Sequence, residues 1–271
     1  MRLGIIGAGS IASVVVDALR AGHLDGVELV GVAGRDTSSA RAVALAERAG
    51  TEALDVEGLL ERDPDWVLEA AGVPAVRAYA LRIVDRGVGL IVISSGGLLD
   101  SDLWSVVAER RLLHDRIVVP SGGIAGLDAL AALRAAGGLA SVALTTFKPP
   151  ASLRKAPFVI DGGIVLSDVD AQVVFEGNVL DAIRGFPANI NVGASVSIAG
   201  IGPERTRVRI VSDPGGSSFR QVLEATGEAG SLHLEVRSTP NPNNPASSYL
   251  SALSAVAAIQ QVRGRGGGAR R

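Results

Sequence analysis

The chain has 271 residues, of which 47% are hydrophobic and 20% charged, and its formal net charge is −2. This composition is typical of a globular protein with one large or two ordinary domains. The near-neutral charge argues against nucleic acid or an anionic membrane as a partner. The chain has no cysteine and three histidines, which excludes disulfides and thiolate metal sites and argues against a histidine-rich one. The apolar stretches are broken by glycines and charges, so we expect a cytoplasmic protein without a signal peptide or membrane span.

The first half of the chain alternates β-rich and helical segments. The connections between them are short, which predicts right-handed βαβ units and a doubly wound parallel sheet. Ser38 and Ser39 are placed to cap the second helix. The expected strands are 3–6, 27–33, 66–70, 89–94 and 117–119, and the expected helices are 11–19, 38–49, 75–86 and 100–111.

The second half has a different pattern, with β-rich segments separated by Pro, Gly and Asn. Strands are expected at 141–147, 173–176, 205–212, 221–225 and 231–237, the last two as an antiparallel pair. A helical pattern at 247–262 follows a stiff Asn-Pro turn, which would dock this helix on the first domain.

The fold class predicted from these patterns is α/β, with a second domain of α+β type whose open-faced sheet is mostly antiparallel. We expect an N-terminal domain over residues 1–123, completed by the C-terminal helix 246–262. The second domain would span 124–245, and the arginine- and glycine-rich tail 263–271 would be disordered.

The clearest motif is a glycine turn between the first strand and the first helix. Gly7, Gly9 and Ala12 form a G-x-G-x-x-A pattern, in which the first glycine permits a tight turn and the second lets the backbone approach a pyrophosphate. The helix that begins at Ser10 and Ile11 would offer N–H donors to that anion. The pattern predicts a Rossmann domain that binds NAD or NADP; the alternative is a tight turn without a ligand.

The second strand ends in Ala33-Gly34-Arg35-Asp36. An acid at the end of this strand reads the ribose hydroxyls of NAD, whereas an arginine can pair with the 2′-phosphate of NADP. Arg35 therefore favours NADP over NAD, although Asp36 remains in reach of a ribose. The alternative for Arg35 is an ordinary charge on a solvent-facing loop.

Eight segments together resemble the L-aspartate dehydrogenase family. They follow the family's order from the first strand to the last helix, and F-P-A-N-I-N-V is the most specific of them. The segments are E-A-A-G at 69–72, I-S-S-G-G-L-L-D at 93–100, P-S-G-G-I-A-G-L-D at 120–128, T-T-F-K-P-P at 145–150, F-E-G at 175–177, F-P-A-N-I-N-V at 186–192, D-P at 213–214 and N-P-A-S-S at 244–248.

The resemblance implies a homodimer and NAD(P)-linked interconversion of L-aspartate with iminoaspartate or oxaloacetate. It also implies which residues border the cofactor, and the paired asparagines suit this role because an amide both donates to and accepts from a carboxamide. The alternative for the two asparagines is backbone turn capping. The cofactor residues implied in this way are Ala71, Gly72, Ser95, Gly122, Gly123, Asn189 and Asn191.

Two positions depart from the family pattern. Gln221 occupies the position of the family's catalytic histidine, and an amide cannot exchange a proton as histidine does. Ala246 replaces a lysine. Lys148 is retained as a cation for a dicarboxylate and as a candidate proton carrier, and its alternative is a surface charge. His233 is expected to be an exposed strand residue rather than a replacement for the missing histidine.

Three functions therefore remain open from the sequence. The first is an aspartate dehydrogenase-like oxidoreductase that transfers hydride between the nicotinamide and an amino, imino or keto acid. The second is an oxidoreductase for a less acidic substrate, since Phe219 would make the pocket more apolar. The third is a catalytically weak NAD(P)-binding pseudo-enzyme or sensor, because the glycine turn is retained while the proton-transfer residue is lost.

Overall fold

A computed structural model of the chain describes residues 1–135, 137–187, 190–216 and 219–264. Its contacts divide the chain into two compact units, each described by itself. Unit 1 comprises Met1–Pro120 and Ser251–Arg271, and unit 2 comprises Ser121–Leu250. The tail that was expected to be disordered lies outside the described residues from 265 onward.

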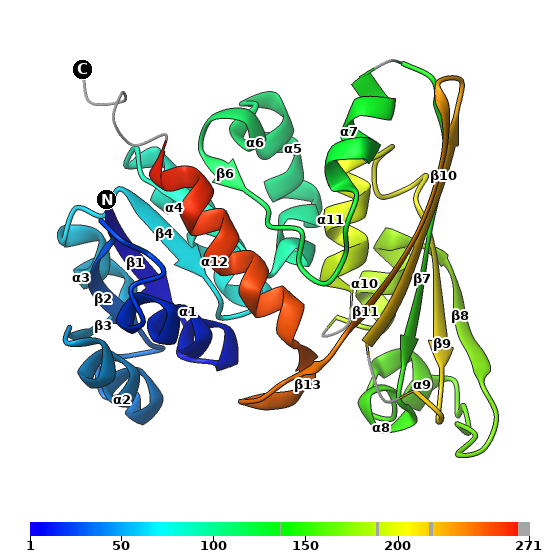
Figure 1. Ribbon diagram of the computed structural model, residues 1–271, viewed down its shortest axis with the longest axis horizontal. Helices are drawn as coiled ribbons and strands as arrows, with labels where there is room; N and C mark the ends of the chain where they lie inside the picture. Colours follow the sequence, from blue (N-terminus) through cyan, green and yellow to red (C-terminus); the bar gives the residue numbers. More distant parts are fainter. Residues whose placement is uncertain (136, 188–189, 217–218, 265–271) are drawn as a thin grey trace. The chain divides into compact units, whose positions relative to one another are not determined.

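Unit 1 is built on a parallel sheet of six strands in the order β3-β2-β1-β4-β5-β6. Figure 1 labels five of these strands, β1 to β4 and β6. From β1 the chain continues to β2 and β3 on one side of the sheet, and β4, β5 and β6 follow on the other side. In such sheets a ligand-binding crevice lies where the order reverses, here at the carboxyl ends of β1 and β4. This sheet confirms the predicted doubly wound architecture. The strands are β1 (Arg2–Ile6), β2 (Glu28–Ala33), β3 (Ala53–Leu54), β4 (Trp66–Glu69), β5 (Gly89–Val92) and β6 (Ile117–Val118).

The helices of unit 1 follow the strands. The structure adds elements that the periodicity missed, β3 and α3 among them, because they are too short to give a pattern. The helices are α1 (Ser10–Arg20), α2 (Ala40–Ala49), α3 (Val56–Glu61), α4 (Val73–Asp85), the 3-10 helix η1 (Ser95–Leu99), α5 (Ser101–Glu109), α6 (Leu112–Asp115) and α12 (Tyr249–Arg263).

The expectation that serines cap α2 by their side chains is wrong. Ser39 is the N-cap residue, but its side chain makes no capping hydrogen bond. The Ser38 hydroxyl and backbone N–H donate instead to Asp36. The carboxylate in the preceding loop is the competing acceptor, and it orders that loop as an Asx-type turn.

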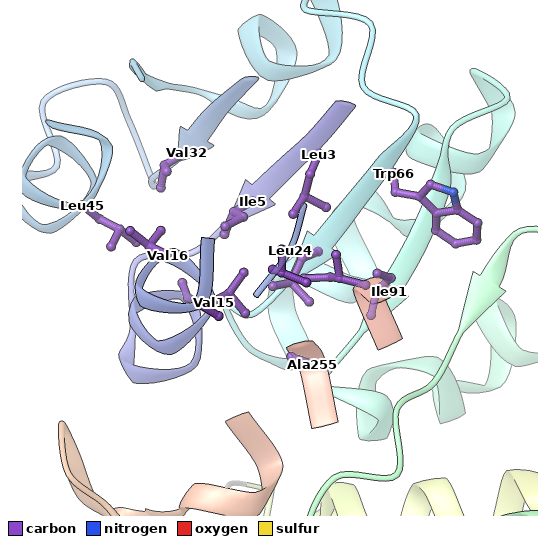
Figure 2. Close-up of a cluster of buried hydrophobic side chains, with 14 of the residues drawn as sticks. Leu3, Ile5, Val15, Val16, Leu24, Val32, Leu45, Trp66, Ile91 and Ala255 are labelled. Atoms are coloured by element: carbon purple, nitrogen blue, oxygen red, sulfur yellow. The ribbon is translucent and has the colours of Figure 1, made fainter. Parts of the chain in front are cut away.

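One side of the unit 1 sheet packs against α1 and α12. Leu3 and Ile5 of β1 are fully buried, and Val15, Val16 and Ala255 join them in one cluster (Figure 2). The C-terminal helix thus forms part of the same core as the first strand. This packing fixes the end of β1, where the glycine turn begins.

Unit 2 contains a five-stranded mixed sheet in the order β11-β10-β7-β9-β8. The pair β7–β9 is parallel, and the other three pairings are antiparallel, which confirms the predicted fold class. The strands are β7 (Leu139–Lys148), β8 (Gln172–Asn178), β9 (Arg207–Ser212), β10 (Phe219–Gly227) and β11 (Gly230–Ser238), with a small hairpin of β12 (Pro240–Asn241) and β13 (Asn244–Ser248).

Helices cover one face of this sheet, as Figure 1 shows. Val142 and Leu144 of β7 pack there with Leu223 of β10 and Val196 of α11. The opposite face carries the alternate residues of each strand. No helix of unit 2 in the described residues covers that face, which we call the open face (Figure 1). The helices of unit 2 are α7 (Leu127–Ala135), α8 (Pro150–Leu153), α9 (Pro157–Asp161), α10 (Val179–Gly185) and α11 (Asn191–Ala199). None of the helices in the described part of the chain has the length and apolar content that a bilayer span requires.

Candidate active site

A cleft of about 1030 Å³ opens in unit 1 at the carboxyl ends of β1, β2 and β4. This is where parallel α/β sheets bind their ligands. It is lined by the turn after β1, the loop between β2 and α2, and the loop and helix after β4. The lining residues include Gly7, Ala8, Gly9, Gly34, Arg35, Asp36, Ser38, Ser39, Arg41, Ala71, Pro74 and Tyr79.

The two glycines of the turn occupy their positions for different structural reasons. Gly7 has φ +102, and a Cβ there would lie 2.5 Å from the Ala70 carbonyl oxygen, so only glycine fits. A Cβ on Gly9 would meet nothing within 4 Å. Gly9 precedes the first turn of α1, whose backbone N–H groups point out of the helix end. This open space beside free donors fits a pyrophosphate.

Two arginines line this cleft beside the end of β2 and on α2. Arg35 and Arg41 both line it, and neither forms a hydrogen bond or ion pair with any described residue. Asp36 is engaged by Ser38 at 2.8 and 3.0 Å. The two guanidinium groups therefore have no ion-pair partner among the described residues, and the adjacent Asp36 already accepts two hydrogen bonds.

Glu69, the last residue of β4, holds the loop that lines the cleft after this strand. One carboxylate oxygen accepts from the N–H groups of Ala71 and Gly72, both at 2.8 Å, and from the Ser94 hydroxyl at 3.0 Å. The other accepts from the Ser94 N–H at 3.0 Å. Burial raises the pKa of Glu69, and these four hydrogen bonds oppose that shift. The carboxylate thus joins the loops that follow β4 and β5.

The remaining sequence-predicted cofactor residues are divided between the units. Gly72 is the N-cap of α4, and Ser95 is fully buried at the start of η1. Ser10 and Ile11 form the first turn of α1. In unit 2, Gly122 has φ +67, Gly123 is buried, and Asn191 begins α11. Asn189 lies outside the described residues.

Unit 2 holds a second group of functional side chains, on the helix-covered face of its sheet. Thr146 lies directly opposite Gln221 in the β7–β10 pairing, and Lys148 lies opposite Ser212 in the β7–β9 pairing. The Thr146 hydroxyl, the Ser212 hydroxyl and the Gln221 carbonyl oxygen are buried without a hydrogen-bond partner among the described residues. Buried polar groups are nearly always paired, so this set indicates a site for a polar ligand.

Lys148 ends β7 on this same face. Its side chain is 8% exposed, and its ammonium lies 5.4 Å from the ring centroid of Phe219. No described residue forms an ion pair or a hydrogen bond with this ammonium. Burial lowers the pKa of Lys148 to about 8. The interpretation of Lys148 as a surface charge is therefore wrong.

His233 lies elsewhere. It pairs with Glu224 across β10 and β11, at 3.3 Å and with its side chain 68% exposed. Because side chains alternate along a strand, His233 and Gln221 occupy opposite faces of the sheet. His233 is therefore an exposed strand residue, as the sequence predicts. In the described residues, no group of three or more acidic or histidine side chains is placed to hold a metal ion.

Comparisons with known proteins identify the family of the chain. The sequence model described as "Aspartate dehydrogenase, C-terminal" matches residues 128–262, and that described as "Homoserine dehydrogenase, NAD binding domain" matches residues 7–120. L-Aspartate dehydrogenase of Methanosarcina mazei is 36% identical, with 97% of each chain covered. That of Methanocella arvoryzae is 38% identical, with 96% of each covered. The chain belongs to the aspartate dehydrogenase family.

Among solved structures, this member of the aspartate dehydrogenase family is similar to the aspartate dehydrogenase of Thermotoga maritima. The TM-score is 0.72 at 26% identity, with 97% of this chain and 96% of that chain covered. The family assignment confirms the resemblance that the eight sequence segments indicate. It also accounts for the presence of a nicotinamide dinucleotide-binding domain.

Several site residues of this aspartate dehydrogenase family member are missed by sequence reasoning. Tyr79 and Arg41 line the cleft from helices, where nothing in their spacing distinguishes them from surface residues. Thr146 and Ser212 come together only through strand pairing. Glu69 does carry a sequence signal, because it is an acidic residue at the end of an otherwise apolar strand.

Proposed function

We propose that the chain is an NAD(P)-dependent amino acid dehydrogenase that interconverts L-aspartate with iminoaspartate and oxaloacetate. The observation that carries this proposal is the family match, which extends over both units and nearly the whole chain. Relatives named L-aspartate dehydrogenase are 34% to 38% identical to this chain. The two groups of site residues give this activity a physical basis.

The cofactor would be held by the cleft of unit 1. Gly7 and Gly9 with the first turn of α1, including Ser10 and Ile11, would bind the pyrophosphate. Ala71 and Gly72, held by Glu69, would border the nicotinamide side. When bound, the nicotinamide supplies the acceptor or donor of a hydride. Ser95 of unit 1 and Gly122, Gly123, Asn189 and Asn191 of unit 2 are proposed to complete the nicotinamide site.

We further propose that NADP is preferred to NAD. Arg35 and Arg41 support this preference, because both line the cleft and neither has a counter-charge among the described residues. A guanidinium pairs bidentately with a phosphate dianion. Asp36 is the residue that would read the ribose of NAD, and its engagement by Ser38 leaves it less able to do so.

The substrate would bind at the polar group of unit 2. A substrate carboxylate would accept hydrogen bonds from the hydroxyls of Thr146 and Ser212, whose buried oxygens otherwise lack partners. Gln221 takes the position of the family's histidine. Its amide would orient the substrate by hydrogen bonding, since it cannot exchange a proton at neutral pH.

A second candidate is an oxidoreductase of the same fold for a less acidic amino acid. Phe219 favours it, because its buried ring lies beside Lys148 and offers an apolar wall. Ala246 favours it too, since the family's lysine at this position would add a second cation. A cofactor-binding protein without turnover is the remaining outcome.

We also propose a cytoplasmic homodimer. The open face of the unit 2 sheet supports the dimer, because Phe147 and Val222 are only half-buried there and Val173 is 54% exposed. Apolar side chains gathered on an uncovered sheet face are typical of an interface. Sedimentation equilibrium would measure the mass, and a monomer at micromolar concentration would contradict the proposal.

The test of activity is reductive amination. The protein is mixed with oxaloacetate, ammonia and NADPH or NADH, and nicotinamide absorbance is followed. Turnover with oxaloacetate supports the first candidate. Turnover with monocarboxylic keto acids alone supports the second. Tight binding of the dinucleotide, measured by fluorescence, without turnover on any keto acid would refute both.

A further inference from the structure

The polar face of the unit 2 sheet contains one side chain able to exchange a proton near neutral pH. Along β7, β9 and β10 the helix-covered positions are apolar toward one end and polar toward the other, where Thr146, Lys148, Ser212 and Gln221 lie. Hydroxyl and amide groups do not titrate in this range. Only the lysine does.

Among the described residues, no charged group on a neighbouring element forms an ion pair with Lys148. Asp213 follows β9, and its N–H donates to the Lys148 carbonyl oxygen, but its carboxylate forms no ion pair with the ammonium. Helices α7, α10 and α11 pack against strands of this sheet. Helix α11 has no charged residue, and those of α7 and α10 are all exposed: Asp128, Arg134, Asp181 and Arg184.

We propose that the ε-amino group of Lys148 carries the proton in catalysis, in place of the histidine that this chain lacks at position 221. The proposal rests on the proposed function, because it requires an amino acid substrate. In the oxidative direction, the neutral ε-amine takes a proton from the substrate's α-ammonium. One N–H bond of the substrate breaks, one forms on Lys148 Nζ, and the lone pair left on the substrate nitrogen makes the Cα–H group a better hydride donor. A bound nicotinamide would supply the hydride acceptor.

Burial of the lysine serves this role. An exposed lysine is protonated at neutral pH and is a poor base, whereas the buried ammonium of Lys148 has a pKa of about 8. A catalytic group works best when its pKa lies near the working pH. The Phe219 ring on one side keeps the amine poorly solvated, and the unpaired hydroxyls of Thr146 and Ser212 are available to orient the substrate around it.

The decisive variant is Lys148→Arg. It keeps a positive charge at this position but cannot release a proton. We expect kcat to fall about 100-fold or more, with little change in KM and none in NADPH binding. Lys155→Arg is the matched control, because the chain contains only these two lysines and Lys155 is exposed. A Lys148→Arg enzyme that retains kcat would refute the proposal, since a purely electrostatic cation survives this exchange.

Two further measurements separate proton transfer from structure. In Lys148→Arg combined with Gln221→His, partial recovery of kcat is expected, with the basic limb of the pH profile displaced toward the histidine range. Independently of turnover, 13Cε-lysine labelling gives one signal for each lysine, and the Lys148 signal should titrate near pH 8 in the unliganded protein. A midpoint above pH 10 would overturn the proposal.

The outcomes also distinguish this proposal from the function on which it rests. A parent enzyme without turnover on any amino acid refutes the proposed function, and this role of Lys148 with it. A parent that turns over while Lys148→Arg does equally well refutes the role of Lys148 alone.

Discussion

Replacement of Glu69 by glutamine is expected to loosen the cofactor cleft while unit 1 remains folded. The glutamine carbonyl oxygen can still accept from Ala71, Gly72 and the Ser94 hydroxyl. Its amide nitrogen would face the Ser94 N–H, which now donates to a carboxylate oxygen at 3.0 Å. Two donors then meet, and one charge-assisted hydrogen bond is lost, which costs about 1.5–3 kcal/mol.

Glu69→Ala should be more severe. It leaves three backbone N–H groups and one hydroxyl without their acceptor. Each orphaned buried donor costs about 1–3 kcal/mol, partly offset by entering water and by relief of the buried charge. We expect a loss of roughly 3–5 kcal/mol in the free energy of unfolding, which is at the upper end for a single substitution.

The assay uses the two tryptophans of the chain, Trp66 and Trp104, which both belong to unit 1. Urea unfolding followed by their fluorescence therefore reports this unit. NADPH affinity is measured in the same proteins, and Glu109→Gln, an exposed acid on α5, is the control. If Glu69→Gln matches this control in both stability and affinity, the carboxylate does not hold the two loops together.

The pH dependence of these variants tests the electrostatic reasoning. Burial raises the pKa of Glu69 above its ordinary value of 4.5, so the native state binds this proton more tightly than the unfolded chain. The stabilisation that follows is complete below pH 4.5 and is lost as pH rises through the raised native pKa. Glu69→Gln lacks this dependence, so its stability deficit should shrink as pH rises. A deficit that grows with pH would mean that the hydrogen bonds outweigh desolvation.

Three further substitutions have defined outcomes. Gly7→Ala places a Cβ 2.5 Å from the Ala70 carbonyl oxygen at a positive φ. NADPH affinity, measured by fluorescence, should fall at least about tenfold. Unchanged affinity would mean that the turn does not bind the dinucleotide. Arg35→Gln should weaken NADPH by roughly 1.5–3 kcal/mol and leave NADH unaffected, whereas equal loss of both would contradict a role in 2′-phosphate recognition. His233→Ala should leave kcat and its pH profile unchanged, because its exposed pair with Glu224 lies on the open face; a lost pH limb would identify it as the missing acid–base group.

Local signals made the first unit readable from sequence. The G-x-G-x-x-A turn and the apolar strands depend on backbone sterics and burial within a few residues, and the structure has them where the pattern predicts. Boundaries differ by one or two residues in several elements, as β10 begins at Phe219 rather than Gln221. The short helices α8 and α9 have too few turns for a helical period to show, and each begins at a proline.

The second site was less readable because it depends on strand register. Nothing in the spacing of Thr146 and Gln221 indicates that they lie opposite one another, and the pairing that joins them is set by the whole length of β7 and β10. A shift of one residue would turn both side chains to the other face. Sequence reasoning identified Lys148 as a candidate cation, but its burial and its lack of a partner required the structure.

Glu69 and Lys148 are both charged side chains that the fold buries, and their surroundings differ in a way that separates their roles. The Glu69 carboxylate accepts four hydrogen bonds from its own chain, so its oxygens have partners within the protein and its effect is to fix the positions of loops. The Lys148 ammonium has an aromatic ring beside it and unpaired hydroxyls on the neighbouring strand positions, so the protein alone leaves its charge uncompensated. Burying an unpaired charge costs several kcal/mol, and a fold retains such a group where a ligand supplies the missing partner. On this reasoning the Glu69 carboxylate needs no partner from a ligand, whereas Lys148 would gain one from the proposed substrate. Added substrate should therefore change the stability effect of a substitution at Lys148 and not of one at Glu69.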